Sequence, residues 1–153
     1  MRLAHLAALA ALVVGCSTAE PMPAAERPGP STSTRPMRIT IQTGAGTRTF
    51  SATLADNPTA RAFADRLPLT LAMAELHGNE KHVDLPNGLP MAPSNPGTIE
   101  TGDLMLYGAR TVVLFYETFR TTYSYTRLGR VDDPTGLAAV VGREGVTATY
   151  ELE

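Results

Sequence analysis

The chain has one cysteine, Cys16, and one lysine, Lys81, and each scarcity excludes a class of protein. A single cysteine cannot form an intramolecular disulfide, so the fold does not depend on cross-links. The other basic residues are dispersed arginines, and the formal net charge is −2. Binding of a polyanion needs a clustered basic surface, so we expect no nucleic-acid partner.

Familiar catalytic motifs are also missing. The sequence contains no Gly-x-Ser-x-Gly elbow, no phosphate-binding glycine loop and no paired-histidine zinc helix. Gly44-Ala45-Gly46 is typical of a hairpin turn and not of a nucleotide loop. The sequence therefore indicates no catalytic residue, no metal and no cofactor, and it leaves open whether the protein is an enzyme.

The longest hydrophobic run, Leu3–Val14, is too short to span a bilayer. Its twelve residues would rise only about 18 Å as a helix, against a hydrocarbon core of about 30 Å. The run ends at Val13-Val14-Gly15-Cys16, which resembles a bacterial lipobox, where a peptidase cuts before a cysteine that carries diacylglycerol. We therefore predict a lipoprotein signal peptide over residues 1–15 and a bilayer anchor through acylated Cys16.

Residues 16–36 are predicted to form a tether between this anchor and a domain over residues 37–153. The segment is rich in proline, serine and threonine, and it cannot bury enough apolar surface to order itself. Ser17 stands where an aspartate would indicate retention in the inner membrane. We therefore expect a bacterial envelope protein anchored in the outer membrane, on its periplasmic or surface side.

The domain sequence predicts mainly β structure. Residues 38–43 and 47–54 indicate a hairpin, and four more alternating or apolar runs indicate strands at 103–107, 111–116, 122–131 and 146–152. A further strand is predicted over 69–73, and the proline-rich stretch 85–97 is predicted to be a long ordered loop, a common place for function.

Two short helices complete the prediction. Asn57 or Asp56 can cap a helix from about Pro58 to Arg66, and Asp133 can cap a second one that covers residues 136–141 and ends at Gly142. Seven or eight strands with few helices favour a closed barrel, which leaves no exposed edge, with a helix at each open end.

The predicted strand 122–131 carries the best candidate binding surface. Period-two geometry places Tyr123, Tyr125 and Arg127 on one face, where two phenol rings and a guanidinium can hold a peptide, a flat ring or a carboxylate. The alternative is a solvent-facing strand in which Arg127 pairs with a neighbouring acid such as Glu117.

A second candidate lies in the stretch ELHGNEKHVD. In an extended conformation Glu80, His82 and Asp84 share a face, and imidazole and carboxylate groups can ligate zinc. Gly78-Asn79 is expected to break the strand and separate His77 from His82. The preferred interpretation is therefore ordinary loop polarity.

Three segments of the domain resemble the bacterial cyclophilin-like fold proteins. They are LADNPTARAFADRLPLTLAMAELHGNEK, LPNGLPMAPSNPGTIETGDLMLYGARTVVLFYETF and TTYSYTRLGRVDDPTGLAAVVG. They occur in order and span nearly all of residues 37–153. The resemblance implies a closed eight-stranded cyclophilin-like β-barrel capped by two short helices, in agreement with the strand count from the residues.

The resemblance implies less about activity. Cyclophilins isomerise prolyl bonds with an arginine in a Phe-His-Arg motif, followed by Phe-Met-x-Gln-Gly, and this chain contains neither motif. No catalytic residue is carried over, and Arg127 replaces that arginine only if it opens into the cleft.

The leading hypothesis is an envelope-anchored domain that binds a small molecule or peptide without catalysis. Two alternatives stay open: a peptidyl-prolyl isomerase of the envelope, and a structural module that docks another envelope protein. The oligomeric state stays unknown. The predicted cleft lies at one opening of the barrel and is approached by residues 85–97. Its expected lining residues are Asn79, Glu80, Tyr107, Phe115, Tyr123, Tyr125 and Arg127.

Overall fold

The computed structural model describes residues 34–153. The predicted signal peptide, Cys16 and most of the tether lie outside these residues. The elements are, in order, β1 (Arg35–Thr43), β2 (Gly46–Leu54), α1 (Pro58–Ala64), β3 (Leu69–Leu76), β4 (Glu80–Asp84), β5 (Thr98–Ile99), β6 (Asp103–Tyr107), β7 (Thr111–Phe115), β8 (Phe119–Arg120), β9 (Thr126–Val131), α2 (Leu137–Val141) and β10 (Val146–Leu152). Within residues 34–153, no helix has the length and apolar character needed to cross a membrane.

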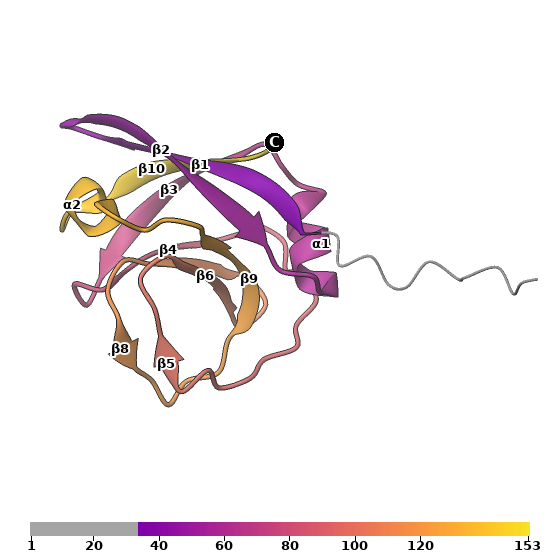
Figure 1. The fold of residues 1–153 in the computed structure, drawn as a ribbon. Coiled ribbons are helices and arrows are strands. Elements are labelled where there is room, and N and C mark those ends of the chain that lie inside the picture. The colour runs from indigo at the N-terminus through magenta and orange to yellow at the C-terminus, as the bar shows by residue number, and fades with distance from the viewer. Residues whose placement is uncertain (1–33) are drawn as a thin grey trace, which may run out of the picture. The chain divides into compact units, whose positions relative to one another are not determined.

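Eight of the strands close into an antiparallel barrel (Figure 1). The order around it is β1-β10-β3-β4-β7-β6-β9-β2, and β1 closes the ring because it pairs with both β10 and β2. The remaining strands, β5 and β8, form a separate two-stranded ribbon. The predicted fold class, a closed eight-stranded barrel with two short helices, is therefore confirmed.

The first hairpin shows how the sequence pattern produces the barrel wall. In β1 the side chains of Met37, Ile39 and Ile41 are fully buried, while the residues between them face outward or are only partly covered. Alternation of this kind places every second residue of a strand on one face. The hairpin of β1 and β2 was predicted and is confirmed.

The helix α1 forms as its capping signal predicts. The Asn57 side chain accepts a hydrogen bond from the Ala60 N–H at 2.7 Å, and Pro58 occupies the first turn. The helix ends at Ala64 rather than at Arg66, and Phe63 is fully buried in the barrel core.

The helix α2 forms where predicted, but its predicted cap is wrong. The Asp133 side chain accepts from the Thr135 N–H at 3.0 Å, within the turn before the helix, and the capping position is Gly136, which makes no side-chain hydrogen bond. The helix ends at Gly142 as expected, and Leu137 is fully buried in the core.

The predicted strand over 122–131 is the largest error in the fold. The strand β9 begins only at Thr126, and Tyr125 forms an isolated bridge with Ser94 instead. The chain before it is drawn away from the barrel because Phe119 and Arg120 pair with β5. Threonine and tyrosine favour extended backbone in either setting, so the alternation could not identify the partner strand.

Hydrophobic residues pack on both sides of one part of the barrel wall. In β6 and β7, Leu104, Leu106, Val112 and Leu114 belong to the main core. The residues next to them in sequence, Met105, Val113 and Phe115, belong to a second cluster with Ile99 and Tyr125, and Phe119 packs against it. The ribbon of β5 and β8 contributes Ile99 and Phe119 to this outer cluster. Because both faces of β7 are covered by hydrophobic residues, the sequence over 111–116 is continuously apolar instead of alternating.

Candidate ligand-binding site

A pocket of about 570 Å³ opens on the outer face of the barrel wall, beside the second hydrophobic cluster. Its lining residues are Leu76, His77, Asn79, Glu80, His82, Asp84, Tyr107, Thr111, Val113, Phe119, Tyr123 and Tyr125. The volume lies within the usual range for small-ligand sites. The site was expected at an opening of the barrel, and the structure places it on the wall instead.

The strand β4 supplies the polar side of the pocket. Glu80, His82 and Asp84 alternate with Lys81 and Val83, and only the first three line the pocket. Lys81 points into the barrel, where it is fully buried. The expectation that Glu80, His82 and Asp84 share a face is confirmed, but they lie on a strand and not in a polar loop.

A tight turn joins β3 to β4 and brings both histidines to the pocket. His77 and Gly78 have φ angles of 55° and 72°, and the Asn79 N–H donates to the Leu76 carbonyl at 3.3 Å. Glycine adopts positive φ without strain, and His77 tolerates it as a turn residue. The strand break expected at Gly78-Asn79 is confirmed, because β3 ends at Leu76 and β4 begins at Glu80, and both His77 and His82 line the pocket. Within residues 34–153, no group of three or more His, Cys, Asp or Glu side chains is arranged to hold a metal ion.

Three tyrosine rings form the aromatic side. The Tyr107 and Tyr123 rings lie 6.2 Å apart between centroids at an interplanar angle of 88°, and the Tyr107 and Tyr125 rings lie 5.7 Å apart. Tyr107 and Tyr123 are 47% and 62% exposed, whereas Tyr125 is only 7% exposed. The three rings pack against one another, and the exposed parts of Tyr107 and Tyr123 are accessible to a ligand.

The polar residues of the pocket include two acids, Glu80 and Asp84, and no lysine or arginine. Burial raises the pKa of Glu80 above its usual 4.5, while the nearby His82 and His77 act in the opposite direction. The Asn79 side-chain oxygen Oδ1 is buried and has no hydrogen-bond partner among the described residues. A buried acceptor without a partner costs stability.

Glu80 and Tyr125 lie close enough to influence each other. Burial raises the pKa of the Tyr125 phenol, and the negative charge of Glu80 raises it further. The carboxylate therefore acts across the pocket toward the aromatic side.

The structure brings most of the predicted site residues together. Asn79, Glu80, Tyr107, Tyr123 and Tyr125 all line the pocket.

Two predicted residues lie elsewhere. Phe115 is fully buried in the outer cluster, with its ring 5.5 Å from that of Tyr125. Arg127 is not among the lining residues, and its Nη1 donates to Asp103 Oδ1 at 3.0 Å. The alternative that paired Arg127 with a neighbouring acid holds, with Asp103 in place of Glu117.

The loop over 85–97 contributes to the site only indirectly. None of its residues lines the pocket. Instead, the Ser94 N–H donates to the Tyr125 carbonyl at 2.9 Å, and the Tyr125 N–H donates to the Ser94 carbonyl at 3.0 Å. The loop thus positions Tyr125, while Leu85 and Leu89 bury its other part in the core.

Four residues that line the pocket were named in neither candidate site predicted from the sequence: Leu76, Thr111, Val113 and Phe119. Alternation along β7 places Thr111 and Val113 on the same face. Their place in the lining could therefore be predicted only after the structure showed that β7 separates two packed layers. Phe119 gave no local signal, because it reaches the pocket only through the pairing of β8 with β5.

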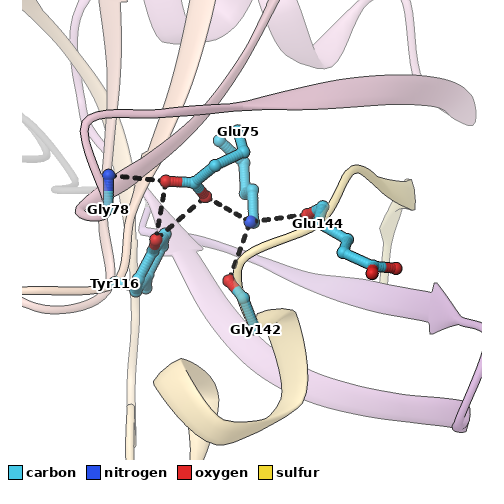
Figure 2. Close-up of polar contacts among 6 residues, drawn as sticks. Glu75, Gly78, Tyr116, Gly142 and Glu144 are labelled. Atoms are coloured by element: carbon cyan, nitrogen blue, oxygen red, sulfur yellow. Dashed lines mark hydrogen bonds and ion pairs between the residues drawn. The ribbon is translucent and has the colours of Figure 1, made fainter.

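Behind the pocket wall, Lys81 belongs to a dense polar network (Figure 2). Its Nζ donates to Glu75 Oε2, to the Gly142 carbonyl at 2.9 Å and to the Glu144 carbonyl at 2.7 Å. The Tyr116 hydroxyl contacts both Glu75 carboxylate oxygens at 2.9 Å, and the Gly78 N–H donates to Glu75 Oε1 at 2.6 Å. Every donor of the ammonium group is used, so this network is structural.

Known proteins support the fold of this domain. A family model described as the cyclophilin-like family matches residues 43–151, well over half of the chain. The solution structure of a hypothetical protein from Archaeoglobus fulgidus is similar, with a TM-score of 0.55 and 21% identity over 85% of this chain and 100% of that chain. At this identity the likeness shows the fold alone. Among curated protein sequences, none matches this chain.

Proposed function

This chain belongs to the cyclophilin-like family, and on that premise we propose that it is a binding protein which holds a small molecule or peptide segment without chemical turnover. The observation that carries the proposal is the pocket on the outer wall, where exposed tyrosine rings face a half-buried carboxylate. Concave sites that combine apolar walls with a few polar anchors are typical of ligand binding.

The same geometry counts against prolyl isomerisation. That reading required Arg127 to open into the cleft, but its guanidinium contacts the buried carboxylate of Asp103. No arginine or lysine is among the residues that line the pocket. The pocket therefore lacks a group that could hydrogen-bond a prolyl nitrogen as the cyclophilin arginine does.

A docking module is also less well supported. That reading required an open apolar face and no pocket. Tyr123 is exposed, but Tyr125 is buried and both line one concave site.

We further propose that the domain is held at the bacterial envelope, in the outer membrane, through lipid on Cys16. The support is the sequence Val13-Val14-Gly15-Cys16 after a short apolar run, followed by the proline-rich segment to residue 36. Incorporation of labelled palmitate into the wild-type protein, and its loss in Cys16→Ser, is the expected result. Equal labelling of both proteins contradicts the proposal.

Thermal unfolding with a library of small molecules and capped peptides tests the binding function. A ligand that binds the folded state raises the melting temperature. The shift should disappear in Tyr107→Ala and persist in Met91→Ala, which changes a side chain of similar exposure, 54%, outside the pocket. A library without any stabilising compound, or shifts that survive Tyr107→Ala, would contradict a ligand site here.

A further inference from the structure

We propose that the ligand of this pocket is a small organic cation, an amine or quaternary ammonium group seated between the tyrosine rings and Glu80. This inference rests on the proposed binding function and names the class of ligand. It also reverses the sequence-based expectation that Arg127 would fix an anionic or carbonyl group.

The first step is the arrangement of the rings. Tyr107 and Tyr123 meet at 88°, and Tyr125 packs against Tyr107 at 54°. Tyr107 and Tyr123 line the pocket and are 47% and 62% exposed, so their rings are accessible to a ligand there, and an aromatic face attracts an alkylammonium group. A neutral ligand of the same shape gains the apolar contact but not this attraction.

The second step is the set of polar side chains around that space. Glu80 and Asp84 bring two carboxyl groups to the lining. Asp84 Oδ1 already accepts from the Thr111 hydroxyl at 2.6 Å, whereas the Glu80 carboxyl group makes no hydrogen bond within residues 34–153. A ligand that carries hydrogen-bond donors and positive charge complements both groups.

The third step is that no lysine or arginine side chain lines the pocket. Lys81, on the same strand, points into the barrel and donates hydrogen bonds to Glu75 and to two backbone carbonyls. Arg127 is held by Asp103. Arg143 packs its guanidinium over Gly78 at the turn and is not among the lining residues. Only His77 and His82 can bring positive charge to the lining itself.

Three probes of one shape test the inference on the full-length protein. Choline, 3,3-dimethylbutan-1-ol and 3,3-dimethylbutanoate share a branched head but are cationic, neutral and anionic. Titration followed by NMR shifts of pocket amides should show choline binding about tenfold more tightly than the alcohol, with the carboxylate weakest. Equal affinity for choline and the alcohol, or preference for the carboxylate, overturns the inference.

Two variants connect the selectivity to the residues. Glu80→Gln should reduce the affinity for choline about fivefold and leave the alcohol unchanged, while Glu151→Gln, an acid on β10 outside the pocket, should change neither. Tyr123→Leu should remove the preference for the cation while the domain keeps its melting temperature, because that side chain is exposed. An unchanged preference in both pocket variants refutes the role of these residues.

A peptide arm separates the two sources of such a cation. Nα-acetyl-lysine methylamide and its norleucine counterpart compare a lysine side chain with a neutral isostere. Tighter binding of the lysine compound than of choline upholds the cation chemistry and overturns a small-molecule source. If neutral or anionic compounds bind in the pocket while no cation does, this inference fails and the proposed binding function stands. If nothing of any charge binds, the proposed function itself fails.

Discussion

The charged side chains on the two faces of β4 differ in how they are partnered. On the inner face Lys81 is fully buried, and Glu75 and two backbone carbonyls accept its hydrogen bonds. On the outer face Glu80 lines a pocket with three tyrosine rings and meets no arginine or lysine there. The strand thus carries a charge held by three hydrogen bonds on one side and, on the other, a carboxyl group whose nearby basic side chains are His82 and His77.

This difference separates the structural role of the inner face from the binding role proposed for the outer face. A buried charge is tolerated only when its partners replace the lost water, so the network around Lys81 must stay intact for the fold. A half-buried carboxylate beside aromatic rings keeps its interaction capacity for something outside the chain. Four experiments test the difference between the two faces.

The largest effect is expected for Lys81→Met. The substitution leaves Glu75 without its charged partner and removes the link from β4 to the segment between α2 and β10. The free energy of unfolding should fall by about 3 kcal/mol, the size seen when one member of a buried pair is removed. Urea unfolding measures it, with Glu80→Gln as the control on the outer face, expected to change stability by less than about 0.5 kcal/mol. Similar losses in the two variants would erase the contrast.

A smaller loss is expected for Tyr116→Phe. The variant keeps the ring beside the Lys81 ammonium, 5.0 Å away, but removes the hydroxyl that contacts both Glu75 oxygens. Hydrogen bonds to charged groups contribute about 1.5–3 kcal/mol, and the lower end applies because Glu75 keeps other partners. Burial raises the pKa of Tyr116 to about 12, so the wild-type hydroxyl stays a donor at neutral pH. A variant as stable as wild type would show that this hydroxyl is dispensable.

The two acids should give opposite pH dependence. Burial alone raises the pKa of Glu75, but hydrogen bonds from Lys81 and Tyr116 outweigh it and lower the pKa below the usual 4.5. Glu75 therefore stabilises the fold fully above about pH 4.5, and this contribution is lost as the pH falls through the lowered pKa. Burial raises the pKa of Glu80, so its ionisation destabilises the fold as the pH rises from 4.5 through the raised pKa.

Urea unfolding between about pH 3 and pH 7 distinguishes these signs. Glu75→Gln should weaken the acid-induced loss of stability, and Glu80→Gln should make the protein slightly more stable at neutral pH. Slopes of the same sign for both acids would show that the two faces do not differ in this way.

The smallest effect is expected for Arg127→Ala in an assay of prolyl isomerisation. A proline-peptide isomerisation assay should give the uncatalysed rate for wild type and for Arg127→Ala, because Arg127 is bound to Asp103 and lies outside the pocket lining. If the wild type catalyses isomerisation and Arg127→Ala abolishes this activity, the protein is an enzyme and the proposal of binding without turnover is overturned.

Most of the barrel was predictable because its signals are local. Alternation in β1 and β2, the Asn57 cap of α1 and the closing strand β10 each depend on neighbouring residues in sequence. The same holds for the group Glu80, His82 and Asp84, whose spacing alone placed them on one face. Tyr107, Tyr123 and Tyr125 were also expected in the site, although the reason given for the last two, a shared strand, was wrong.

The sequence by itself determined the closed β-barrel and the residue types that a binding site would use. Only the tertiary structure decided that Lys81 turns inward, that Arg127 is held by Asp103 and that the ribbon of β5 and β8 brings Phe119 to the pocket. The physical reason is that these outcomes depend on partners distant in sequence. Local propensity specifies an extended backbone, but pairing across the barrel specifies which charged side chain is neutralised inside the barrel and which one lines the outer pocket.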